Sequence, residues 1–277
     1  IWTGDTLFYT HGFKNVLPKY VSYLFDSIDW MRYNEATGVP SLTAKTISNI
    51  KKAIPPLEEQ KKIAEILSTW DEAIEKQSKL IKKLELRKRG IMQRLLTCHT
   101  RLPGFTTPWQ KVKLGDICKE TTIKNTKNAK YIVLSCTKYK GLVSSLEYFG
   151  KQIFSNDLKQ YKIVPKNHFA YATNHIEEGS IGYQIDYDYS LISPMYTVFK
   201  TNENKINNHF LYALLKTPLM MYNYKSRIEG SIDRRGGLRY NTFAKIPILL
   251  PTLNEQNAIS KILTTIDEEI NIQHKKL

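Results

Sequence analysis

A 25-residue segment occurs twice in this chain. PPLEEQKKIAEILSTWDEAIEKQSK (55–79) returns as PTLNEQNAISKILTTIDEEINIQHK (251–275), without a gap and with 13 identities in 25 positions. In both copies the apolar residues recur at the three- and four-residue steps of an amphipathic helix. A long helix with one apolar stripe needs a partner that covers the stripe. The repeat therefore predicts two helices that pack together as a coiled coil.

The first copy predicts a helix from Leu57 to about Thr97. Two prolines precede it, glutamates follow in the first turn, and arginines and lysines gather at its end, as the helix dipole favours. About 40 residues at about 1.5 Å each predict a rod of roughly 60 Å. The predicted seam comprises Ile63, Leu67, Trp70, Ile74 and Gln77 in the first copy and Ile259, Leu263, Ile266, Ile270 and Gln273 in the second. We interpret Trp70 as a residue that fills the rod. The matched glutamines either fix the helix register or were inherited from one ancestral repeat, and both explanations stay open.

The segment between the helices has a different composition. Residues 130–136, 162–173, 180–185 and 195–199 predict strands, and residues 208–225 predict a helix with a proline interruption. Tyr196 and Phe199 alternate along the last of these strands and are expected in the core. The pattern predicts an α+β domain of about 150 residues.

The residues before the first helix repeat only the end of that domain. TLFYT (6–10) matches TVFKT (197–201), LPKYVSYLF (17–25) matches INNHFLYAL (206–214), and 38–60 matches 234–256. The predicted division is thus 1–56, the end of a first domain; 57–100, the first helix; 101–250, a second domain; and 251–277, an incomplete second helix. We expect a piece of a longer protein of nearly 400 residues, with about 85 residues of the first domain absent.

The net charge indicates the class of partner, and the cysteines indicate the redox compartment. Forty-one basic residues against 26 acidic residues give a formal net charge of +15, which favours a polyanionic partner. Cys98, Cys118 and Cys136 have neither disulfide-framework nor zinc-knuckle spacing, so a reduced, cytoplasmic setting is expected. Apolar runs are too short for a membrane helix, and no membrane association is expected.

The order of these elements resembles the specificity subunit of type I restriction-modification enzymes. The resemblance is carried by GVPSL (38–42), IPPLEEQKKIAEIL (54–67), WQKVKLGDIC (109–118), GSIG (179–182) and ISPMYTVF (192–199), in that order. It implies an α+β fold with duplicated target recognition domains joined by long conserved helices that form an antiparallel coiled coil. Each domain would read a few base pairs of double-stranded DNA, and the helices would set the unread gap between the half-sites.

The resemblance also implies partners. Two methyltransferase subunits, which carry S-adenosylmethionine and methylate adenine, and ATP-hydrolysing restriction subunits would assemble on this subunit, which has no catalytic centre or cofactor of its own. The front of the first domain is missing relative to the family pattern. Reading of that half-site is therefore in question, and self-association of a truncated chain is an open alternative.

Motifs for a separate enzyme are weak. The chain has neither a methyltransferase Asn/Asp-Pro-Pro-Tyr/Phe loop nor a GxxxxGK[ST] phosphate loop. His175-Ile176-Glu177 matches half of a zinc-deaminase signature but lacks its P-C-x-x-C partner. Glu59-Gln60-Lys61 has the E-x-K spacing of a nuclease, but a match this short arises easily by chance. No catalytic residue and no metal ligand are predicted.

Three loops of the second domain are candidates for DNA contact, because arginine and lysine suit guanine while asparagine suits adenine. The candidate DNA-binding residues are Lys138, Tyr139, Lys140, Asn174, His175, Arg234, Arg235 and Arg239. The alternative for each loop is that it is solvated and contacts only DNA phosphates, or does not contact DNA. For the whole chain, one alternative is a basic coiled-coil interaction protein that binds RNA or an anionic surface. Another is a specificity domain fused to a catalytic domain outside this sequence.

Overall fold

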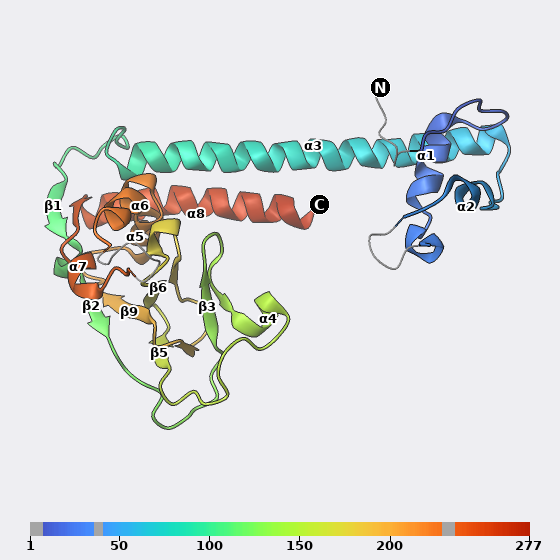
Figure 1. Cartoon of the computed structure of the whole chain (residues 1–277). Coiled ribbons are helices and arrows are strands. Elements are labelled where there is room, and N and C mark those ends of the chain that lie inside the picture. The colour runs from blue at the N-terminus through green and yellow to red at the C-terminus, as the bar shows by residue number, and fades with distance from the viewer. Residues whose placement is uncertain (1–7, 36–40, 229–235) are drawn as a thin grey trace. The chain divides into compact units, whose positions relative to one another are not determined.

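The computed structural model (Figure 1) describes residues 8–35, 41–228 and 236–277. The chain folds as two compact units. The first comprises residues 1–82 with 273–277, and the second comprises residues 83–272. The boundary falls inside the long helix α3 (Leu57–Leu96), so this helix contributes to both units. It ends one residue before the predicted end.

The first unit places two short helices and a 3-10 turn before α3. They are α1 (Pro18–Asp26), η1 (Trp30–Tyr33) and α2 (Ala44–Ser48). Helix α1 begins with a proline at its first position, and the Thr43 side chain caps α2 by accepting a hydrogen bond from the Thr46 amide. The Tyr23 hydroxyl donates to Asp71 on α3, which ties α1 to the first half of the long helix.

The second unit is an antiparallel α+β domain. Its strands are β1 (Gln110–Lys113), β2 (Cys118–Thr121), β3 (Leu134–Thr137), β4 (Gly141–Ser144), β5 (Lys162–Pro165), β6 (Phe169–Ala172), β7 (Ile181–Tyr183), β8 (Tyr189–Ile192), β9 (Tyr196–Thr201) and β10 (Pro247–Leu250). A central sheet has the order β2-β9-β6-β7, and the pairs β1–β10, β3–β4 and β5–β8 surround it. All these pairings are antiparallel.

Helices and 3-10 turns connect these strands. They are η2 (Leu114–Asp116), α4 (Ser145–Phe149), η3 (Ile176–Glu178), α5 (Asn208–Leu215), α6 (Pro218–Lys225), α7 (Tyr240–Phe243) and α8 (Leu253–Lys275). The interrupted helix predicted at 208–225 is present as α5 and α6, and Thr217 caps the second piece. The strand predicted at 162–173 is two strands, because Asn167 turns the backbone at a φ of 62°. The strand predicted at 130–136 begins later, at Leu134.

Aromatic residues fill the core of the second unit. Strand β6 is buried along its whole length, since helices cover one face of the sheet and β3–β4 lies near the other. The rings of Phe169 and Phe199 stack at 5.1 Å, and those of Tyr171 and Phe243 lie 5.0 Å apart. Phe199 is fully buried, as the sequence predicts, whereas Tyr196 is half-buried against a smaller apolar cluster.

Helix α8 lies alongside the last part of α3 (Figure 1). Leu84 of α3 clusters with Ile266 and Ile270, whereas the earlier α8 residues Ile259 and Leu263 share the main core with Leu95 at the end of α3. The two helices therefore run antiparallel. Among the described residues, no helix is both long and apolar enough to cross a membrane.

Candidate nucleic-acid interface

The predicted DNA-contact loops of the second unit adjoin one another around the β6–β7 connection. At the start of that connection, the Leu238 amide donates to the Thr173 carbonyl over 2.8 Å. The Tyr171 hydroxyl donates to the Leu238 carbonyl over 3.0 Å inside the core. These bonds anchor the described end of the arginine loop beside Thr173, and they place Arg239 next to the segment that carries Asn174.

The other end of the β6–β7 connection meets the β3–β4 turn. The Lys216 ammonium, at the end of α5, donates to the Lys138 carbonyl over 3.0 Å and to the Gly179 carbonyl over 2.6 Å. Gly179 ends η3, which follows His175 directly. One lysine thus holds the basic turn against the connection that carries Asn174 and His175.

The predicted contact residues differ in exposure. Lys138, Tyr139, Lys140, His175 and Arg239 are exposed, and Asn174 is half-buried. Tyr139 is 85% exposed, with the Lys138 ammonium 5.4 Å from its ring centroid, so an apolar ring and a cation stand together in solvent. Arg234 and Arg235 lie outside the described residues. The structure places the other six on adjoining loops, and their contact with DNA stays a prediction.

A small acidic cluster interrupts this basic surface. His175 Nδ1 lies 3.5 Å from a Glu178 carboxylate oxygen, and ligand atoms of His175, Glu177 and Glu178 lie within 4.8 Å of one another. Such spacing fits a cation in principle. Exposed acidic groups often stand this close without an ion, so we assign no metal site to them.

The seam of the paired helices divides into a covered and an exposed part. Ile259, Leu263, Ile266 and Ile270 of α8 are all buried. The Gln77 amide donates to the Gln273 side-chain oxygen over 2.9 Å and to its carbonyl over 2.8 Å. Lys88 of α3 and Asp267 of α8 form an ion pair.

The first half of the α3 seam is exposed. The side chains of Leu67, Ile74 and Trp70 are 37%, 50% and 65% exposed, and Ile63 is half-buried. Our interpretation that Trp70 fills the rod is therefore wrong for this structure. Gln77 contacts Gln273 close to the last residue of α8. Trp70 lies about two helical turns before Gln77 on α3.

Two buried glutamines in the repeated helix starts were missed by sequence reasoning. Gln60 accepts a hydrogen bond from the Leu17 amide (2.9 Å) and donates to the carbonyls of Asn15 (3.1 Å) and Pro55 (2.8 Å). Its side chain joins the chain before α1 to the start of α3. The Glu-Gln pair shared by both helix starts was the available signal, but polar residues in a first turn are ordinarily solvated.

Gln256 occupies the repeat-equivalent position in the second unit. It accepts from the Asn207 amide (2.8 Å) and donates to the carbonyls of Lys205 (3.1 Å) and Pro251 (2.9 Å). These bonds make Asn207, and not Ile206, the counterpart of Leu17. The alignment of 17–25 with 206–214 is therefore off by one residue, because it matched apolar letters instead of the backbone groups that the glutamines bind.

Glu255, next to Gln256, forms a second buried anchor. The Arg101 guanidinium donates to its carboxylate from Nε (3.1 Å) and Nη2 (2.6 Å), and Trp109 Nε1 donates over 3.2 Å. The hydrogen bond to Glu255 raises the pKa of Arg101, and the Glu255 side chain is fully buried. This anchor ties the segment after α3 to the start of α8.

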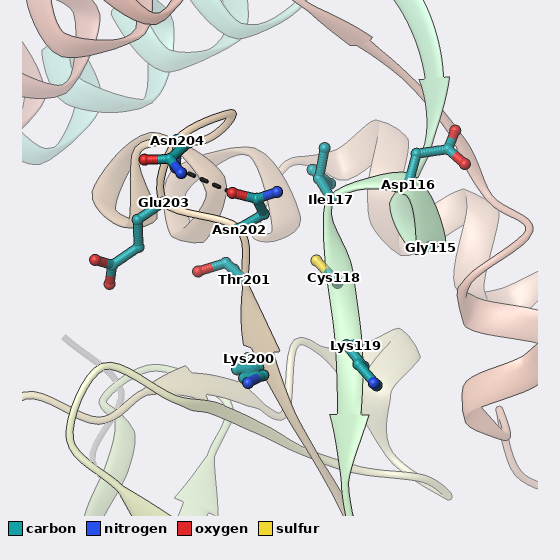
Figure 2. A pocket seen from close by; sticks show the side chains of 10 residues that line it. All are labelled: Gly115, Asp116, Ile117, Cys118, Lys119, Lys200, Thr201, Asn202, Glu203 and Asn204. Atoms are coloured by element: carbon teal, nitrogen blue, oxygen red, sulfur yellow. Dashed lines mark hydrogen bonds between the residues drawn. The ribbon is translucent and has the colours of Figure 1, made fainter.

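Figure 2 shows an open groove between β2 and the segment that follows β9. Its volume is about 640 Å³, and Lys119, Lys200, Asp116 and Glu203 place charges of both signs around it. Burial raises the pKa of the Cys118 thiol to about 12, so this thiol is protonated at neutral pH and unsuited to nucleophilic attack. The Tyr240 hydroxyl, next to Arg239, donates to the Cys118 carbonyl over 2.7 Å, and none of the described residues that line the groove is an evident catalytic group.

The repeated domain-and-helix plan defines a class of duplicated α+β proteins built on antiparallel helices. The family model for the type I restriction modification DNA specificity domain matches residues 6–86 and 106–277. Because these ranges cover most of the chain, the chain belongs to the type I restriction-modification DNA specificity family.

A curated relative agrees with this membership, and two solved structures share the fold. The chain is 29% identical over 266 residues to the type I restriction enzyme MjaVIII specificity subunit of Methanocaldococcus jannaschii, covering 87% of this chain and 61% of that protein. It thus spans less than two thirds of that relative. The S subunit of a type I system from M. genitalium has a TM-score of 0.56 at 19% identity, covering 93% of this chain and 68% of that one. The HsdS subunit from Thermoanaerobacter tengcongensis has a TM-score of 0.50 at 16% identity, covering 94% and 64%.

Proposed function

We propose that this chain reads a split double-stranded DNA target for a type I restriction-modification enzyme. The observation that carries the proposal is the repeated attachment of a domain to a helix start, through Gln60 in one unit and Gln256 in the other. A protein that reads two half-sites needs two such attachments. Family membership and the adjoining loops that carry Lys138, His175 and Arg239 support the same reading.

The proposed role is recognition without catalysis. The chemistry would belong to two methyltransferase subunits, which supply S-adenosylmethionine and methylate adenine, and to ATP-dependent restriction subunits. The net charge of +15 would attract DNA phosphates over distance, and loop side chains would then select bases. We place this assembly in the cytoplasm, where it meets DNA.

The paired helices would act as a spacer in this scheme. Helices that pair through a buried apolar seam have a defined register, so the domains attached to them would stand a constant distance apart. A constant distance between two reading domains gives a constant number of unread base pairs. The bipartite target is the functional consequence of the duplication.

Selection from a random duplex library tests this proposal. The chain is assembled with its own methyltransferase subunit, and bound DNA is recovered and sequenced. We expect two short fixed blocks separated by a constant unread gap. One block would mean that only one of the two units reads DNA. Salt-sensitive binding without any enriched sequence would overturn the proposal in favour of a basic coiled-coil protein that binds nucleic acid generally.

A further inference from the structure

Lys216 bridges two loops that the DNA-reading proposal uses. Its ammonium donates to the carbonyls of Lys138 and Gly179. Each carbonyl belongs to a different candidate contact loop. The ammonium also lies 5.7 Å from the ring centroid of Tyr212, on the preceding turn of α5. The side chain is half-buried and thereby removed from its preferred place in solvent.

The surroundings oppose the charge of Lys216. Burial lowers the pKa of this lysine, which shows that desolvation disfavours its charged form. Charge-assisted bonds to two carbonyls offset that cost. Placing a partly buried lysine between two loops costs desolvation free energy. This cost is understandable if the function requires a fixed separation between the loops.

The strands that carry the two loops also pack closely against each other. A Cβ atom on Gly182 of β7 would lie 2.5 Å from the Leu142 amide nitrogen on β4, and a Cβ atom on Gly141 would collide with the Tyr212 hydroxyl. Gly141 and Leu142 directly follow the Lys138–Lys140 turn, so backbone meets backbone beside the same loops that Lys216 joins. The close strand packing and the Lys216 bonds together set the position of Lys138 relative to His175.

Resting on the proposed function, we propose that Lys216 is a positioning residue for base selection: it fixes the separation between the Lys138–Lys140 turn and the segment with Asn174 and His175. Lys216 itself need not touch DNA. Base reading depends on side chains meeting base edges at hydrogen-bond distance, so a shift of one loop against the other changes which bases are accepted. The effect is confined to the half-site that the second unit reads.

The test compares Lys216→Met with Lys216→Arg in the complex with the methyltransferase subunit, by selection from the random duplex library. Methionine keeps much of the side-chain length and loses both bonds, whereas arginine keeps charge and donors. With Lys216→Met, we expect enrichment of the preferred base to fall about tenfold at one or more positions of one block. The other block and the gap keep the wild-type pattern, and Lys216→Arg restores part of the lost selectivity.

Lys200→Met is the matched control, because it removes one exposed positive charge from β9, outside the three loops. It should leave both blocks unchanged. Amide hydrogen exchange gives a second measurement: residues 137–141 and 174–179 should exchange faster in Lys216→Met. If Lys216→Met does not fold, Lys216→Gln, which shortens the side chain but keeps an N–H donor, is scored in the same way.

Two results would overturn the inference. One is an unchanged pattern of base enrichment in the folded Lys216→Met or Lys216→Gln complex. The other is an equal loss of enrichment in both blocks, which would indicate general destabilisation. Failure of the proposed function itself is distinguishable, since the wild-type complex would then enrich no block.

Discussion

Gln60 and Gln256, 196 positions apart, make the same three backbone hydrogen bonds. Each accepts one amide and donates to two carbonyls, and each side chain is completely buried. A side-chain amide suits this role because it carries a donor and an acceptor on one rigid plane. The long helices and the segments before them are therefore joined by a repeated, buried polar anchor.

Replacing either glutamine by glutamate tests this anchor. Gln256→Glu keeps the shape and the accepting oxygen but loses both donated bonds, and it places a carboxylate against two carbonyl oxygens. We expect a loss of about 2–4 kcal/mol in the free energy of unfolding, measured by urea denaturation. Gln60→Glu should give a similar loss in the first unit. Gln273→Glu, at a half-buried position, is the control and should cost less.

The repeat was readable from the sequence because 13 of its 25 positions are identical. The spacing of its apolar residues predicted the helix pairing, and the strand-like segments between the helices predicted the α+β domain. The structure contains both. The role of Gln60 was missed, because its partners are backbone groups and the Glu-Gln pair repeated at both helix starts does not by itself indicate a buried side chain. The role of Lys216 was also missed, since its two carbonyl partners are 78 and 37 positions away. The exposure of Trp70 was missed because periodicity predicts an apolar stripe but does not show which of its residues a partner covers.

Leu67 and Leu263 hold equivalent places in the repeat but differ in burial. The first is 37% exposed, and the second is 4% exposed. Leu263→Ala should lower the free energy of unfolding by about 3 kcal/mol, because it leaves a cavity in the main core. Leu67→Ala should cost about 1 kcal/mol or less. Urea denaturation followed by circular dichroism measures both changes.

This pair also tests whether the exposed stretch of α3 is covered in solution. An equal cost for Leu67→Ala and Leu263→Ala would contradict the exposure seen here. Sedimentation of the wild-type chain would then show whether a second copy supplies the cover.

The Gln77–Gln273 contact predicts coupled mutations. Gln77→Leu alone leaves the half-buried Gln273 amide without its side-chain partner, and Gln273→Leu does the reverse. The double variant should lose less free energy of unfolding than the two single variants lose in sum. We expect a coupling of about 1 kcal/mol in a double-mutant cycle. Strict additivity would mean that the bond contributes nothing to stability. In that case, inheritance from an ancestral repeat would be the better explanation of the matched glutamines.

Arg239 is exposed beside the β6–β7 connection and is predicted to contact DNA. The triple variant Arg234→Ala, Arg235→Ala and Arg239→Ala is expected to abolish or relax reading of one half-site. For Arg239→Ala alone, the dependence of binding on salt separates two kinds of contact. Loss of a phosphate contact lowers the slope of log K against log salt by about 0.9 and weakens all sequences alike. Loss of a base contact leaves that slope nearly unchanged and relaxes one position by about 1–3 kcal/mol.

We expect the second pattern for Arg239, because its loop adjoins the segment with Asn174 and His175 and presents its guanidinium to solvent. Arg32→Ala is the control. It also removes one positive charge, but the Arg32 side chain is 80% exposed and pairs with Asp29. The control should change neither the selected bases nor, beyond a small long-range effect, the affinity. Equal weakening by Arg239→Ala and Arg32→Ala would mean that Arg239 contributes only to the general positive field, and the prediction for this loop would be wrong.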